Sequence, residues 1–120
     1  MQPRLEQKMG FLPSTILTAF IWFAWHLPLF FITGTAQNSN NPLSFILSCL
    51  SITFATVAIR HISKGAWLYI LFHCVTNALQ GSLPLVEDYR INLVTSAVLI
   101  AASLVVVWIN SRKQPSKASA

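Results

Sequence analysis

The sequence predicts an all-α polytopic membrane protein with four transmembrane helices, and three observations lead to this class. Of the 120 residues, 54% are hydrophobic and only 9% are charged, whereas a soluble domain carries about 25% charged residues. The mean hydropathy is +0.60. Polar or basic segments separate four apolar runs, at residues 11–32, 43–59, 66–81 and 91–109. We expect one membrane domain over residues 1–111 and a polar cytoplasmic tail over residues 112–120.

The first apolar run, Phe11 to Ile32, has 22 residues without a charge, enough to cross a bilayer after a short polar helical or interfacial lead-in over residues 1–10. His26 lies inside it and should face a protein interior or a wet cavity, because lipid offers an imidazole no hydration. Pro28 has no N–H for the carbonyl of Ala24. We therefore expect the helix to loosen around His26 and to leave that carbonyl bare. One helical face carries Thr15, Ala19, Trp22 and His26.

The second run, Leu43 to Ile59, follows Asn41 and Pro42, which suit the N-cap and the first helical position. Small residues recur on one face of this run, and small side chains let helices approach closely in a bilayer. We assign the helix to packing. The basic segment 60–65 is predicted to be a tight turn, with His61 as a solvated loop residue. The small face comprises Ser44, Ser48, Ser51, Ala55 and Ala58.

The third run begins near Ala66, and Gly81 and Pro84 are expected to end it. Polar residues recur along it at helical spacing. A stripe this polar should not face lipid, so it either joins helices by hydrogen bonds or lines a cavity. The stripe consists of Tyr69, His73, Thr76, Asn77 and Gln80.

The fourth run, residues 91–109, follows a short loop with Glu87, Asp88 and Arg90 and contains neither charge nor histidine. We give it a scaffold role, with Ser96, Ala101, Ala102 and Ser103 as packing residues. Cys49 and Cys74 both fall in apolar runs and are interpreted as small packing residues.

Basic residues set the predicted topology. They gather in the lead-in, in the second turn and in the tail, and the positive-inside rule then places both termini in the cytoplasm. The net charge of +5 is therefore explained by loop charge, and we expect no nucleic-acid partner. The residues in these three places are Arg4, Lys8, Arg60, Lys64, Arg112, Lys113 and Lys117, and the third loop has only Arg90.

Two histidines in different runs define the candidate chemistry. His73 and Asn77 lie one turn apart, so an imidazole and a carboxamide on one face could donate hydrogen bonds to an oxyanion. A histidine opposite, His26, could orient or deprotonate water. No carboxylate lies between Phe11 and Val86. If both helices start at the same membrane surface and run straight across, a rise of 1.5 Å per residue places the two histidines at depths that differ by roughly 10 Å.

Two segments resemble the motifs of the CPBP (Abi) family, which comprises the CAAX prenyl proteases and their bacterial relatives. Ile21-Trp22-Phe23-Ala24-Trp25-His26-Leu27-Pro28 is similar to its FxxxH-like motif, with Trp22 at the phenylalanine position. Leu71-Phe72-His73-Cys74-Val75-Thr76-Asn77 is similar to its HxxxN motif. The resemblance extends over nearly the whole chain and implies an intramembrane endopeptidase of a bacterial plasma membrane, acting on a membrane-embedded or prenylated peptide.

By this resemblance, His26 is the water-activating partner, and His73 and Asn77 are the oxyanion donors. The family's glutamate motif, EExxxR, should stand just before Pro3-Arg4-Leu5, where the sequence begins, and the single Glu6 does not replace it. We therefore expect a C-terminal part of such a protease with little or no proteolysis of its own.

Three alternatives remain. The first is a non-catalytic membrane scaffold or an immunity-type partner of another membrane protein. The second is a haem protein with His26 and His73 as axial ligands. The third is a zinc site, for which two histidines and Asn77 fall short of the usual three strong ligands. We expect no cofactor.

Overall fold

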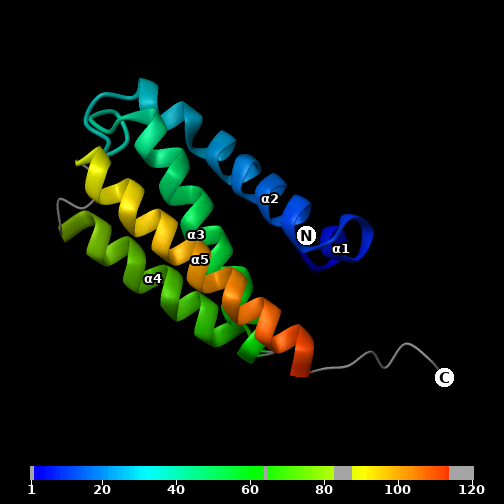
Figure 1. The fold of residues 1–120 in the computed structure, drawn as a ribbon. Helices are drawn as coiled ribbons and strands as arrows, with labels where there is room; N and C mark the ends of the chain where they lie inside the picture. The colour runs from blue at the N-terminus through cyan, green and yellow to red at the C-terminus, as the bar shows by residue number, and fades with distance from the viewer. Residues whose placement is uncertain (1, 64, 83–87, 114–120) are drawn as a thin grey trace.

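The computed structural model describes residues 2–63, 65–82 and 88–113, and these residues form helices and turns without a strand (Figure 1). Three helical segments, Phe11–Phe31, Pro42–Ser63 and Tyr89–Lys113, are long and apolar enough to cross a membrane. A fourth apolar segment, Ala66–Leu79, is shorter. The predicted class, an all-α polytopic membrane protein, is confirmed. The elements are α1 (Gln2–Met9), α2 (Phe11–His26), the 3-10 helix η1 (Leu27–Phe31), α3 (Pro42–Ser63), α4 (Ala66–Ser82) and α5 (Tyr89–Lys113).

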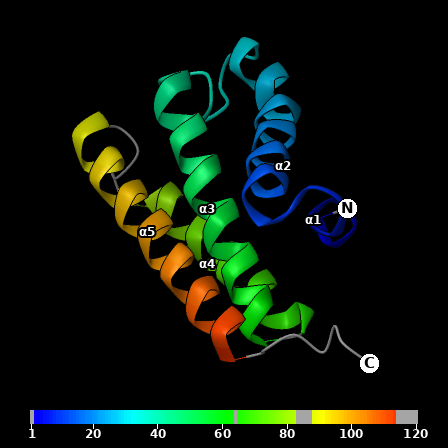
Figure 2. The ribbon, with the colours of Figure 1, turned by 45° about the vertical axis from the view of Figure 1, so that its right-hand side comes forward.

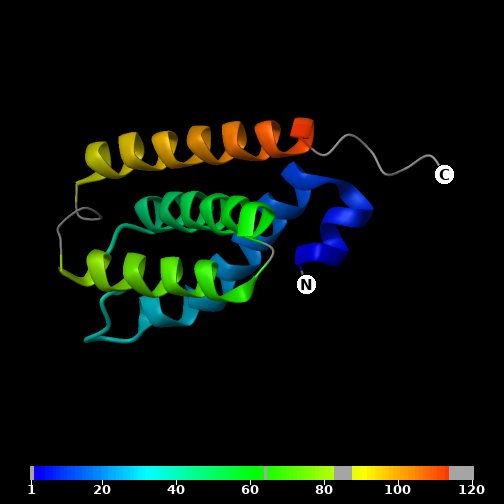
Figure 3. The ribbon, with the colours of Figure 1, turned by 90° about the horizontal axis from the view of Figure 1, so that it is seen from below.

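Helix α3 is the centre of the bundle, because α2, α4 and α5 all pack on it. Helices α3, α4 and α5 run side by side, whereas α2 crosses them obliquely (Figure 3). Helix α1 folds back beside the start of α2 (Figure 2) and lies toward the same end of the bundle as the end of α5. Within the described residues, α2 and α4 have no close backbone contact with each other.

The face of α3 with small residues packs on α5, as predicted. Its serines and alanines are buried, and Asn41 caps the helix, its side-chain oxygen accepting a hydrogen bond from the Leu43 N–H at 2.9 Å. On α5, Ser96 and Ser103 are buried, but Ala101 and Ala102 are exposed, so that part of the packing prediction was wrong. Asn92, which the sequence analysis did not select, is also buried in this interface, and its amide donates a hydrogen bond to the Ser44 carbonyl oxygen of α3.

The first span changes its helix type at His26, as Pro28 predicted. The α-helix ends there and η1 continues to Phe31. The prediction of a bare Ala24 carbonyl was wrong, however, because the N–H of Leu27 donates to it. The tighter hydrogen bond of a 3-10 turn thus replaces the one that proline cannot make.

Helix α3 continues to Ser63, so Arg60 and His61 are helical, and the predicted loop position of His61 was wrong. The His61 side chain is half-buried and contacts the Glu6 carboxylate. The Glu6 carboxylate, 2.6 Å from His61 Nε2, thus takes the place of the water that would bond to this imidazole in a loop.

The later boundaries follow the predictions closely. Helix α4 begins at Ala66, and Pro84 and Glu87 lie outside the described residues. Helix α5 begins before Arg90 and reaches Lys113, two residues into the predicted tail, whose residues 114–120 lie outside the described part. Cys49 is buried and Cys74 exposed.

Candidate functional site

His26 is held at the last position of α2. Its Nδ1 lies 2.8 Å from the carbonyl oxygen of Trp22, and only a protonated Nδ1 can bond to a carbonyl. The hydrogen bond therefore leaves Nε2 as the lone-pair nitrogen. The ring of Phe45 from α3 packs against the imidazole at a centroid distance of 5.4 Å. An oriented imidazole with a free acceptor nitrogen can bind or deprotonate a water molecule.

His73 and Asn77 form the second half of the site on α4. The Asn77 amide nitrogen lies 3.1 Å from His73 Nε2, so the carboxamide donates to Nε2 and Nδ1–H becomes the donor of this imidazole. His73 is half-buried and Asn77 is exposed. The carboxamide keeps a second N–H, so His73 and Asn77 each retain one N–H that can donate to a further acceptor.

Trp22 joins the two halves. Its ring centroid lies 5.9 Å from that of His26 and 4.9 Å from that of His73. The sequence predicted that His26 and His73 lie at different depths in the membrane. Trp22 contacts both because it lies one turn before His26 and because α2 crosses the bundle obliquely (Figure 3). The structure thus brings the predicted residues of α2 and α4 to one indole ring.

A cavity of about 270 Å³ lies beside this indole, and we call it the inner cavity. It confirms that part of the polar stripe of α4 lines a cavity. Asn77 lies outside the lining, and the side chain of Gln80 lies outside the described part. Two threonines of α3 complete the wall, and sequence reasoning missed them because isolated threonines give no signal. The lining residues are Trp22, Thr53, Thr56, Tyr69, Ile70 and His73.

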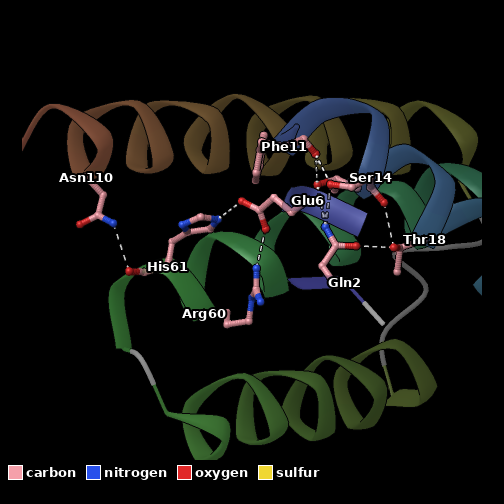
Figure 4. Close-up of polar contacts among 9 residues, drawn as sticks. Gln2, Glu6, Phe11, Ser14, Thr18, Arg60, His61 and Asn110 are labelled. Atoms are coloured by element: carbon pink, nitrogen blue, oxygen red, sulfur yellow. Dashed lines mark hydrogen bonds and ion pairs between the residues drawn. The ribbon is translucent and has the colours of Figure 1, made fainter. Parts of the chain in front are cut away.

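A polar cluster ties α1 to α2 and α3 at one end of the bundle (Figure 4). The Glu6 carboxylate lies 2.5 Å from Arg60 Nη2 and 2.6 Å from His61 Nε2. The Gln2 amide nitrogen lies 3.3 Å from the hydroxyl of Ser14, and its oxygen accepts a hydrogen bond from Thr18. Helix α1 buries none of its own residues, so these polar contacts hold it in place.

Neither described carboxylate is placed to act as a base beside the histidines. Glu6 is occupied by Arg60 and His61, and Asp88 accepts a hydrogen bond from the backbone N–H of Arg90 at 2.9 Å. Over residues 2–63, 65–82 and 88–113, no three His, Cys, Asp or Glu side chains could jointly hold a metal ion. The site thus offers an acceptor imidazole and two donors, which suits water orientation and oxyanion binding.

These features define a polytopic membrane protein whose apolar helices carry a polar site of two histidines and an asparagine. Residues 1–79, which include His26, His73 and Asn77, match the model of the Rce1-like family, described as type II CAAX prenyl endopeptidase. The chain belongs to this family.

A similar protein is CAAX prenyl protease 2 of Methanococcus maripaludis, with 28% identity over an alignment of 109 residues that covers 84% of this chain and 40% of that protein. The chain therefore spans about 40% of the length of this relative. No solved structure matches the chain significantly.

Proposed function

We propose that His26, His73 and Asn77 form the histidine and asparagine part of an intramembrane endopeptidase site that cleaves a peptide near a prenylated C-terminus. The observation that carries the proposal is the contact of Trp22 with both imidazoles. These contacts support a site in which His26 of α2 and His73 of α4 share one indole, beside the inner cavity that Trp22 and His73 line. The family and the name of the Methanococcus maripaludis relative support the substrate class.

The roles follow from the hydrogen bonds. The free Nε2 of His26 orients the attacking water and accepts its proton. When the substrate binds, the Asn77 amide leaves His73 Nε2, and the imidazole, now protonated at Nε2, and the carboxamide both donate to the oxygen that becomes negative in the tetrahedral intermediate. Each such donor typically contributes 10²–10³-fold in kcat.

We propose that the 120 residues alone show little or no proteolysis. The described carboxylates lie elsewhere, in the α1 cluster and at the start of α5. A general base contributes about 10²–10⁴-fold, and a carboxylate outside these residues would have to supply it.

We further propose a plasma-membrane protein with both termini in the cytoplasm. The described basic side chains support this orientation, since most of them lie on α1 and on the ends of α3 and α5, which share one end of the bundle (Figure 1).

The test is a chimera in which this chain replaces the matched segment of the Methanococcus maripaludis protein. In proteoliposomes it should cleave a farnesylated peptide. His26→Ala and His73→Ala should each lower kcat by at least about 10²-fold, and Asn77→Ala by about 10²–10³-fold. Cys74→Ser is the matched control, because Cys74 is exposed and adjoins His73. Cleavage that survives both histidine substitutions would contradict the proposal.

The alternative is a non-catalytic membrane scaffold or an immunity-type partner, and the missing carboxylate beside His26 favours it. In that case His26→Ala and His73→Ala would leave the biological activity of the native chain intact while the protein stays folded. Far-ultraviolet circular dichroism of both variants in detergent checks the folding.

A further inference from the structure

A second cavity adjoins the inner one and reaches a buried part of the α1 cluster. It has a volume of about 400 Å³, and we call it the outer cavity. Thr56 and Tyr69 line both cavities, so the two meet at these side chains. Gln2 and Pro3 of α1 cover the outer cavity, and Arg60 is the charged residue in its wall. We call the line from His73, past these two shared side chains, to the Arg60 guanidinium the path.

The guanidinium of Arg60 is already suited to a carboxylate. It holds the Glu6 carboxylate at 2.5 Å through a single nitrogen, Nη2. Its Nε is buried and has no hydrogen-bond partner among the described residues. Arginine has five N–H donors in a planar fork that matches a carboxylate, and a buried donor without an acceptor is unfavourable. The free donors of Arg60 therefore call for a further acceptor.

The length of the path matches three peptide residues. Thr53 and His73 both line the inner cavity, and Arg60 follows Thr53 by seven positions on α3. Seven residues of an α-helix rise about 10 Å, and three extended peptide residues span at most about 10 Å. A C-a-a-X peptide ends in a free carboxylate three residues after its prenylated cysteine.

We propose that Arg60 binds the C-terminal carboxylate of the peptide substrate and thereby sets the distance from the chain end to the bond at His73 and Asn77. This inference rests on the proposed function. The two aliphatic residues of the motif would lie between Thr56, Val57 and Tyr69 in the outer cavity. Glu6 positions the guanidinium and shares it with the substrate carboxylate, and His61 Nε2 contacts the other carboxylate oxygen of Glu6 at 2.6 Å.

Binding to the 120-residue chain in lipid nanodiscs tests this inference without requiring catalysis. The probes are a farnesylated Cys-Val-Ile-Ala peptide with a free C-terminal carboxylate and the same peptide with a C-terminal amide. We expect the acid to bind about 10- to 100-fold more tightly than the amide, as is typical of charge-assisted hydrogen bonds. Arg60→Gln should lower the affinity for the acid to that for the amide.

Glu6→Gln is the control for a merely structural role of the ion pair. It breaks the same pair but keeps the guanidinium, so the preference for the acid should persist or increase. The inference is overturned if wild type does not prefer the acid, if Arg60→Gln weakens both peptides equally, or if Glu6→Gln removes the preference as Arg60→Gln does.

The chimera separates the two proposals. Histidine-dependent cleavage without a preference for the acid would overturn the role of Arg60 and leave the proposed function standing. A preference for the acid together with histidine-independent cleavage would support the role of Arg60 and overturn the proposed function.

Discussion

Asn92 offers a quantitative test of how the bundle is held together. Its amide nitrogen donates to the Ser44 carbonyl oxygen at 2.7 Å, and its side-chain oxygen accepts from the Ser48 hydroxyl at 3.2 Å. Both bonds connect α5 to α3, and Asn92 is only 5% exposed. Polar bonds between membrane helices contribute about 0.6 kcal/mol on average and about 1.7 kcal/mol at most.

Asn92→Ala removes both bonds, so the sum is about 1–3 kcal/mol. The lower half of this range is expected, because Ser48 can still donate to the Ser44 carbonyl oxygen, 3.1 Å away. A loss of about 1–2 kcal/mol in the free energy of unfolding changes the folded-to-unfolded ratio about 5- to 30-fold. Reversible unfolding by SDS in mixed micelles, followed by tryptophan fluorescence, measures this loss.

Two control variants accompany this measurement. Val98→Ala removes an exposed side chain from the same helix and should change the unfolding free energy little. Ser44→Ala removes a buried hydroxyl that has no partner among the described residues and should be neutral or stabilising. If Asn92→Ala unfolds like Val98→Ala, the polar contacts do not hold α5 to α3 and the reasoning is refuted.

Three further predictions concern α1, the cysteines and the indole. Glu6→Gln should speed hydrogen exchange in α1 about tenfold or more, because the helix loses its ion pair with Arg60 and weakens its contact with His61; unchanged exchange would contradict this. In detergent, a maleimide should label Cys74 in the folded protein and Cys49 only after denaturation, as intact mass will show. In the chimera, Trp22→Ala should lower kcat about 10- to 100-fold by displacing both imidazoles, whereas Trp22→Phe, which keeps an aromatic ring, should lower it only a few-fold.

Local patterns predicted the helices and the packing face of α3. Small residues at helical spacing, such as Ser48 and Ala55, are buried as expected. The spacing alone shows that they share one face, and small side chains on a face let another helix approach closely. Asn41 and Pro28 mark an N-cap and a change of helix type through their own backbone chemistry. Such features depend on a few neighbouring residues and can be read from the sequence.

Contacts between distant residues could not be read in this way. Glu6 and His61 are separated by 55 positions. From the sequence alone His61 therefore resembles a loop residue, because its contact with Glu6 of α1 cannot be predicted. Asn92 lies near a charged loop in the sequence, and nothing local shows that it faces α3. Apolar residues lie on every side of α5, so the sequence does not show which face packs on α3, and the prediction for Ala101 and Ala102 was wrong for this reason.

The candidate site lies between these cases. Spacing alone placed His73 and Asn77 on one face, and their bond of 3.1 Å agrees with it. The relation of His26 to His73 depends on the oblique crossing of α2, which no pattern in the sequence specifies. The resemblance to the family predicted that the histidines converge, and the structure adds that Trp22 is the side chain between them.

One side of α3 packs tightly on α5, and the other side lines the cavities beside the candidate site. Toward α5, small side chains and the Asn92 bonds close the interface. On the other side, α2 and α4 pack on α3 but have no close backbone contact with each other in the described residues, and both cavities lie beside side chains of these helices, such as Trp22 and Tyr69. Helix α5 packs on α3 along the interface that contains Asn92 and thereby stiffens the wall that carries Thr53, Thr56 and Arg60. A stiff wall fixes the distance from Arg60 to His73, and a site that measures three residues from a chain end needs that distance constant.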